Sequence, residues 1–358
     1  MRIAVGVLVA GLLCAGRAGA AEAVEWMVEL RLDGRQIEGT PLAWSRQRVH
    51  MLGRDGWLWE FDPDRATDYH KTSSRFRPYA PSEFRAELLR DLGKGFEVSG
   101  TGHYLVAHPR GQRDKWAGRF EELYRSFVHY FSVRGFKLKK PPLSLIGIVC
   151  RNQREFAQYS MDNGMSVSSG ILGYYSAESN RITVYDMHDR HDLDDWHRTA
   201  SVIIHEATHQ TAFNTGVHSR YAPPPLWVAE GLATMFEAPG VYDSRHYTSR
   251  SDRVNRARLR AFRQLEPQHK PAMLASLVSC DALFRQEPAA AYAEAWALTF
   301  FLVETQPRKY MKYLAITARR PPFTEYTSAE RVGDFASVFG RDWPMLEARF
   351  LRFMAGVK

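Results

Sequence analysis

The chain of 358 residues contains little cysteine and lacks the motifs of several large enzyme classes. Its cysteines are Cys14, Cys150 and Cys280, and none stands in a close pair such as C-x-x-C, so they do not predict a metal site. The sequence leaves open whether Cys150 and Cys280 form a disulfide or remain two thiols. There is no G-x-S-x-G, no phosphate-binding loop and no dinucleotide-binding glycine pattern. The sequence therefore lacks the usual signatures of serine hydrolases, nucleotide hydrolases and dehydrogenases.

The excess of positive charge is also small. The chain has 48 Lys and Arg against 40 Asp and Glu, a formal net charge of +8. The basic residues are scattered, and the densest run, at 134–140, accompanies no nucleic-acid-binding signature, so we interpret it as solvated surface and expect no nucleic-acid partner. A hydrophobic content of 45% with 13% aromatic residues favours a well-packed globular body over disorder.

The N-terminus has an apolar run that is too short to span a bilayer comfortably. Arg2 precedes this run at 3–15, and the small residues at 18–20 follow in an A-x-A arrangement. This pattern is typical of a cleavable secretory signal peptide, here residues 1–20. We therefore expect an exported protein, periplasmic or secreted, without a retained membrane anchor.

Strand patterns come first along the chain and helical patterns later. Apolar and polar residues alternate in short stretches of 21–75, which predicts a small β region. The polar, proline-containing stretch at 63–81 is interpreted as a linker. A strong helical period covers 116–131, a hairpin is predicted at 171–185, and from about residue 193 onward the pattern is mostly helical. This order predicts an α+β fold, with a mixed sheet followed by helices.

The motif that carries chemistry is His205-Glu206-Ala207-Thr208-His209, H-E-x-x-H. Apolar residues at helical spacing precede and interrupt it, so it is expected on a long helix. Positions i and i+4 lie on one face of a helix, which lets His205 and His209 share one metal ion. Glu206 stands beside the first ligand and can reach a water at the metal, as in metallopeptidases.

A catalytic zinc ion takes three protein ligands and keeps one position open, so a third ligand is required. The best candidate is Glu230, in Leu226-Trp227-Val228-Ala229-Glu230-Gly231. Three prolines at 223–225 break the chain before this segment, and 226–237 reads as a second helix. The intervening loop is long enough to return Glu230 to the metal.

The pair HEATH and WVAEGLATMFE resembles the gluzincin zinc metallopeptidases, including uncharacterised bacterial peptidase-MA-like proteins. The resemblance covers roughly 140–320 within a predicted catalytic domain at 76–358. It implies one Zn²⁺ per chain held by His205, His209 and Glu230, with Glu206 as the general base. It also implies that Glu237, seven positions after Glu230, orients a ligand from outside the metal shell, while an ordinary surface position for Glu237 stays open.

Gluzincins often use a downstream Tyr or His to stabilise the oxyanion. By this resemblance Tyr292, at the start of a predicted helix, is the first choice. Tyr242, His246 and Tyr247 are rivals on a nearer loop, and a core aromatic role for Tyr292 stays open.

Zinc-dependent hydrolysis of peptide bonds is therefore expected, with a peptide or protein as the substrate. The aminopeptidase motif G-x-M-E-N is absent, which favours endopeptidase action. A zinc amidohydrolase acting on cell-wall peptides, and a non-catalytic envelope protein that keeps the fold for binding, are the alternatives. The hairpin at 171–185 is a candidate edge for adding a substrate strand.

A second group of possible ligands precedes the motif, but its spacing fits no tight metal template. We interpret it as a polar loop and helix start. Its members are His188, Asp189, His191, Asp192, Asp194, Asp195 and His197.

Overall fold

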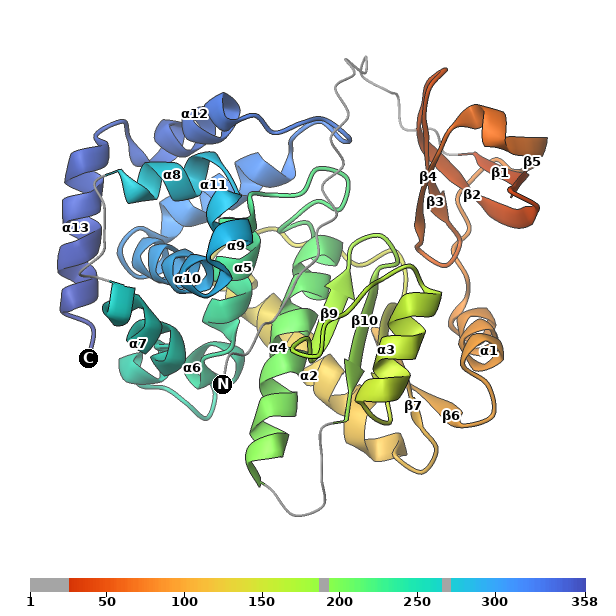
Figure 1. Ribbon diagram of the computed structural model, residues 1–358, viewed down its shortest axis with the longest axis horizontal. Coiled ribbons are helices and arrows are strands. Elements are labelled where there is room, and N and C mark those ends of the chain that lie inside the picture. Colours follow the sequence, from red (N-terminus) through yellow and green to blue (C-terminus); the bar gives the residue numbers. More distant parts are fainter. Residues whose placement is uncertain (1–25, 187–192, 266–271) are drawn as a thin grey trace.

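In the computed structural model, residues 26–186, 193–265 and 272–358 are described. Two five-stranded sheets occupy the first half of the chain and helices dominate the second, so the α+β prediction is confirmed. Figure 1 shows the first sheet at one end of the molecule, the second sheet in the middle and the later helices at the other end. The predicted signal peptide lies outside the described residues.

The first sheet is antiparallel, with the strand order β4-β3-β2-β1-β5. Its strands are β1 Met27–Leu32, β2 Arg35–Trp44, β3 Val49–Gly53, β4 Leu58–Phe61 and β5 Ala66–Ser73, with the short 3₁₀ helix η1 Pro63–Arg65 between the last two. The linker predicted at 63–81 was wrong in part, because it contains β5. That edge strand is exposed at most positions, so its polar sequence shows no alternation between buried and solvated residues.

The second sheet has the order β6-β7-β8-β10-β9, with β7, β8 and β10 parallel and the two outer strands antiparallel. Helices α1 and α3 pack on one face, whereas α2 and α4 pack on the other. The elements are α1 Pro81–Leu92, β6 Phe96–Gly100, β7 Tyr104–Pro109, α2 Arg113–Ser132, β8 Leu145–Cys150, α3 Gln153–Asp162, β9 Gly173–Ser176, β10 Arg181–Tyr185 and α4 Leu193–Thr215.

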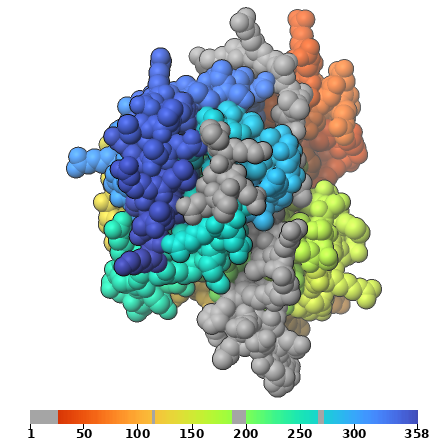
Figure 2. Space-filling model, turned by 60° about the vertical axis from the view of Figure 1, so that its left-hand side comes forward, coloured from red at the N-terminus to blue at the C-terminus, as the bar shows by residue number. Residues whose placement is uncertain are grey.

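The helical half closes around one large apolar core that includes Trp227, Trp296 and Phe350. Figure 2 shows its C-terminal helices gathered on the face that is turned forward. None of the helices in the described ranges is long and apolar enough to cross a bilayer. The helices are α5 Leu226–Phe236, α6 Pro239–Tyr242, η2 Arg250–Arg253, α7 Arg256–Leu265, α8 Met273–Ser279, α9 Ala282–Gln286, α10 Pro288–Thr305, α11 Pro307–Ala318, α12 Ser328–Phe339 and α13 Trp343–Ala355.

The two cysteines beyond the predicted signal peptide are not bonded to each other. Cys150 is buried at the end of β8, and Cys280 is partly buried after α8. Burial raises the pKa of the Cys150 thiol to about 12, so this group stays protonated and packs as a small apolar side chain.

The hairpin β9–β10 is fixed to helix α4 by a buried polar network. Asn180, in the turn, adopts the left-handed conformation with φ of +60°, which asparagine tolerates. Its side-chain oxygen accepts hydrogen bonds from the Tyr175 hydroxyl at 2.8 Å and from Nδ2 of Asn214 at 2.7 Å. Gln210 donates to the Asn180 carbonyl at 2.8 Å. The helix that carries His205 and His209 is therefore held in a defined position against the hairpin.

Arg220 joins the first sheet to the same hairpin. Its guanidinium donates to the carbonyl oxygens of Ala177 at 2.8 Å, Glu178 at 3.0 Å and Gly56 at 2.8 Å. The backbone N–H of Leu58 also donates to the Glu178 carbonyl at 2.8 Å. These bonds cross from the loop before β4 to the turn of β9–β10, so the first sheet supports the hairpin.

Helices α5 and α10 pack so closely that the residue after Glu230 has no room for a side chain. A Cβ atom on Gly231 would lie 2.1 Å from the Thr299 hydroxyl oxygen and 2.5 Å from the Ala295 carbonyl oxygen. The close approach brings α10, with Tyr292 in its first half, next to the helix that carries Glu230.

We expect Gly231→Ala to lower the free energy of unfolding by about 3 kcal/mol, because the added methyl group collides with the backbone of α10. Thermal melting measures this change. The matched control is Gly333→Ala in α12, where an added Cβ meets nothing within 4 Å. That variant should melt at the same temperature or slightly higher, because alanine favours the helix by up to about 1 kcal/mol. Equal melting temperatures for the two variants would contradict this packing account.

Candidate metal centre

Three side chains from two helices converge on one buried point. Helix α4 presents His205 and His209 one turn apart, and α5 presents Glu230. Nε2 of His205 lies 3.1 Å from Nε2 of His209 and 3.2 Å from Oε2 of Glu230. Nε2 of His209 lies 3.6 Å from the same oxygen. All three residues are at most 1% exposed, and together they form a group able to hold a metal ion.

These separations fit the ligand shell of a tetrahedral zinc ion. Zinc–nitrogen distances of about 2.0–2.1 Å at tetrahedral angles place two donor atoms about 3.3 Å apart. The three observed separations lie on either side of that value. Two imidazoles and one carboxylate are also the donor set of catalytic zinc sites that keep one open position. His205, His209 and Glu230 are therefore suitable ligands for a zinc ion.

The orientation of His205 is fixed from behind. Its Nδ1 lies 2.8 Å from Oε1 of Glu237, at the C-terminal end of α5. A carboxylate only accepts, so Nδ1 carries a proton, and Nε2 is the ring nitrogen that faces His209 and Glu230. The other oxygen of Glu237 accepts from Nδ2 of Asn255 at 2.8 Å. Such carboxylate partners fix the tautomer and the ring plane of metal-binding histidines.

The buried carboxylates of the centre are stabilised by a positive charge. Burial disfavours the imidazolium of His205, but hydrogen bonds to Glu230 and Glu237 outweigh burial and raise its pKa to about 10. Burial likewise opposes ionisation of Glu230, yet His209 and His205 lower its pKa to about 2. In the metal-free centre a proton balances the carboxylate, and a bound cation would take over that role.

Glu206 lies beside the three donors and is completely buried. Its Oε2 accepts the backbone N–H of Tyr175 at 2.7 Å, whereas its Oε1 has no hydrogen-bond partner among the described residues. A buried carboxylate oxygen without a partner is costly, unless a ligand or water meets it. Burial raises the pKa of Glu206, although His205 and His209 oppose this, and a raised pKa suits a proton acceptor.

Tyr292 reaches the same centre from α10. Its ring lies 6.3 Å from the ring of His205 and packs edge-on against Phe284. Burial, and then the negative charges of Glu230 and Glu206, raise the pKa of Tyr292 well above its ordinary value, so its hydroxyl keeps a proton to donate.

The rival residues on the loop after α6 lie in different surroundings. His246 pairs with Asp243 at 2.8 Å and has a side chain that is 78% exposed. Tyr247 is 45% exposed, and Tyr242 packs against the main apolar core. Of the four candidates, Tyr292 is the one whose ring is found beside the ring of a metal-binding candidate in the described part of the chain.

A family model described as "Protein of unknown function (DUF1570)" matches residues 199–324, a stretch that contains every residue placed at the centre so far except Tyr175. The chain matches none of the curated proteins. Among solved structures it is similar to two of a mutant M1 zinc metallopeptidase from Deinococcus radiodurans, the second bound to a Tyr-Ser-Ala substrate. The identities are 13% and 14% and the TM-scores 0.39 and 0.33. Each match covers 73% of this chain and 51% of the other, so the chain spans about half the length of those structures.

Strand β9 forms the edge of the second sheet beside the metal centre. An added Cβ on Gly173 would lie 2.7 Å from Val202 of α4 and 2.6 Å from Val184. Glycine is thus required here by the close approach of the helix. In an antiparallel pair, alternate residues turn both backbone groups toward the partner strand. Because the Tyr175 N–H points to Glu206, Tyr175 and Gly173 belong to the set that faces the free edge.

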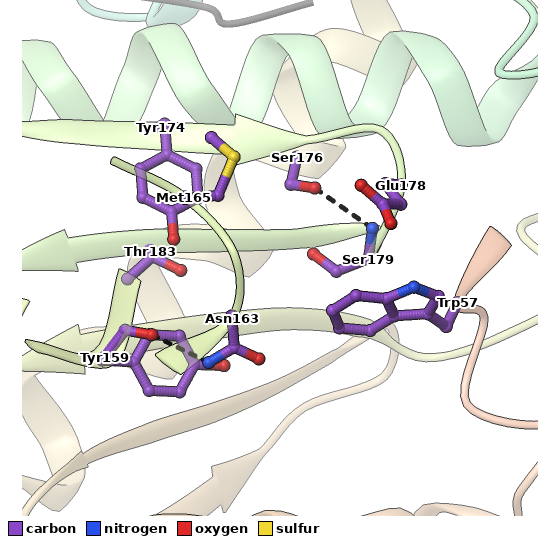
Figure 3. A pocket seen from close by; sticks show the side chains of 9 residues that line it. All are labelled: Trp57, Tyr159, Asn163, Met165, Tyr174, Ser176, Glu178, Ser179 and Thr183. Carbon is purple, nitrogen blue, oxygen red and sulfur yellow. Dashed lines mark hydrogen bonds between the residues drawn. The ribbon is translucent and has the colours of Figure 1, made fainter. Parts of the chain in front are cut away.

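A small hollow lies at the turn end of β9, between the first sheet and α3 (Figure 3). Trp57 lines it from the loop before β4, and Tyr174 and Ser176 line it from β9. Tyr174 packs with the α1 and α3 face of the sheet, whereas Tyr175 packs with the α4 face. The hollow therefore lies on the opposite face from the metal centre, and none of the three metal-binding candidates lines it.

Three parts of the centre were missed by sequence reasoning. The backbone N–H of Tyr175 leaves no trace in a sequence pattern. Asn255 precedes α7, and Arg258, whose Nη2 lies 3.9 Å from Oε1 of Glu237, is in the first turn of that helix. Both belong to a basic stretch without a motif, so nothing in the sequence singles them out. The polar loop and helix start predicted at 188–197 fall on residues whose side chains lie outside the described part.

We expect Glu237→Ala to weaken zinc binding about tenfold to a hundredfold, because His205 loses the acceptor that fixes its tautomer. Competition with a chromophoric chelator measures the affinity. The matched control is Glu304→Ala, another partly buried glutamate, whose partners are Arg250 and Arg253. Unchanged affinity in the first variant, or an equal loss in both, would contradict the role of Glu237.

Proposed function

We propose that the protein is a zinc-dependent hydrolase of peptide bonds. The observation that supports this most strongly is the group of His205, His209 and Glu230 at zinc-ligand spacing, with the buried carboxylate of Glu206 beside it. A binding protein or a structural zinc site has no need of this second carboxylate. Bound zinc would supply Lewis acidity, which brings the pKa of a water near neutrality and polarises a carbonyl group.

The side chains of this centre divide the remaining work. Glu206 would accept a proton from water at Oε1 while the Tyr175 N–H holds Oε2 in place, and would then donate that proton to the leaving amine. The Tyr292 hydroxyl would donate a hydrogen bond to the substrate carbonyl oxygen as negative charge develops on it. Glu237 keeps His205 oriented throughout.

The free edge of β9 is the surface on which an extended peptide would bind. The outward backbone groups of Gly173 and the outward carbonyl of Tyr175 can pair with a substrate strand by β-augmentation. Since Tyr175 also bonds to Glu206, such a strand would pass directly beside the general base. This position favours a peptide over a compact amide, although the same chemistry would cleave other amides.

For Glu206→Gln we expect about one zinc ion per chain, as in the wild type, and a loss of hydrolysis of at least about a thousandfold. The amide keeps the shape of the side chain but accepts no proton. Metal analysis together with cleavage of denatured proteins and of peptidoglycan fragments tests this, and the preferred substrate separates a peptidase from a cell-wall amidase. Wild-type activity in the variant would contradict the assignment of Glu206 as the general base.

For Tyr292→Phe we expect kcat to fall about a hundredfold to a thousandfold at unchanged zinc content, because one donor to the oxyanion is removed. Tyr247→Phe is the matched control on the rival loop and should keep wild-type kcat. The opposite pattern, with loss only in the control, would transfer the role to that loop.

A further inference from the structure

Arg258, in the first turn of α7, lies on the outer side of Tyr292. Its guanidinium carbon is 5.0 Å from the centre of the Tyr292 ring, and that ring is 6.3 Å from the ring of His205. The guanidinium is therefore no farther than about 11 Å from His205, a span that about three extended residues cover. A cation thus stands within a few substrate residues of the bond to be cleaved.

The donors of this guanidinium are poorly used. Its side chain is only 17% exposed, and its nearest acidic partner is Oε1 of Glu237, at 3.9 Å from Nη2. That distance exceeds a hydrogen bond. Both oxygens of Glu237 already accept shorter bonds, at 2.8 Å from His205 and at 2.8 Å from Asn255. Among the described residues, no side-chain hydrogen bond of Arg258 within normal geometry is found.

Two other enclosed arginines of the protein have close partners. Arg220 donates three hydrogen bonds of 2.8 to 3.0 Å to carbonyl oxygens. Arg331, with a side chain that is 15% exposed, pairs with Asp281 at 2.9 Å. The guanidinium of Arg258 lacks such partners, and the incomplete burial of its side chain leaves its donors open to solvent. Arg258 is thus set up to donate to an acceptor that arrives from outside.

The side chains near Arg258 also show from which direction that acceptor would come. The metal-binding candidates are at most 1% exposed, Tyr292 is 9% exposed and the Glu237 side chain 12%. Exposure therefore increases from the metal centre through Tyr292 toward Arg258. A ligand that contacts Tyr292 and extends toward solvent on this side would lie within reach of the guanidinium.

We infer that Arg258 binds a carboxylate of the peptide substrate, within three residues of the cleaved bond. The guanidinium fork matches a carboxylate in a bidentate arrangement, while its face stays on the Tyr292 ring. The carboxylate is either the C-terminus of a short peptide or an Asp or Glu side chain. The inference rests on the proposed function only in taking a peptide as the ligand of the metal centre.

The test measures binding, so that it does not depend on turnover. The protein is zinc-loaded Glu206→Gln. The first probes are N-acetylated alanine peptides of two to six residues, each as the free acid and as the C-terminal amide. The second probes are the same peptides, amidated, with one Asp or one Asn at each position. We expect the acid of one pair to bind about tenfold to a hundredfold more tightly than its neutral partner, and the pair identifies the source of the carboxylate.

Adding Arg258→Gln should bring that ratio to about one. Adding Arg260→Gln, an exposed arginine on the same helix, should leave the ratio unchanged, and zinc content and thermal melting confirm that both proteins are folded. The inference is overturned if no probe binds, if acid and neutral forms bind equally, or if the preference survives in Arg258→Gln. Acid preference in binding without any hydrolysis by the wild type would uphold the inference while refuting the proposed function.

Discussion

The structure around the metal centre depends on the contact between Glu230 and the two imidazoles of α4. A carboxylate and two histidines share one buried volume, and each is at most 1% exposed. Charges in such a place are tolerated only when they are balanced by close partners. The donor separations of 3.1, 3.2 and 3.6 Å show that the balance is built around one point, which is the geometry that a small cation requires.

The surrounding fold keeps this point fixed from three directions. The amide pair of Asn180 and Asn214 locks α4 onto the hairpin β9–β10 one turn beyond the second histidine. The absence of a side chain at Gly231 lets α10 approach α5 and bring Tyr292 to the centre. Glu237, held by Asn255, sets the tautomer of His205. Rigid secondary structure, rather than loops, thus carries every side chain assigned a role at the metal, which is what a precise site needs.

Much of this arrangement could be predicted from the sequence, because its signals are local. The four-residue spacing in H-E-x-x-H places both imidazoles on one face of a helix whatever the rest of the fold does. The third ligand was the acid of the helical segment that follows the prolines at 223–225, and the resemblance to gluzincins supported it. The outer carboxylate came from that resemblance alone. The pattern of short strands followed by helices was enough for the α+β class.

The parts of the fold and of the site that were not predicted depend on contacts between distant segments. The spacing of apolar residues along the sequence carries no information about such contacts. Strand β5 was taken for a linker because an exposed edge strand has no apolar face. The bond from the Tyr175 backbone to Glu206 and the place of Arg258 beside Tyr292 arise only when the hairpin, α7 and α10 meet.

X-ray absorption at the zinc edge of the purified protein tests the central claim most directly. The account predicts a zinc ion with nitrogen and oxygen ligands only, two of them imidazoles, at about 2.0–2.2 Å and with a coordination number near four. Sulfur ligands at about 2.3 Å, an all-oxygen octahedral shell, or a protein that retains no zinc would contradict it.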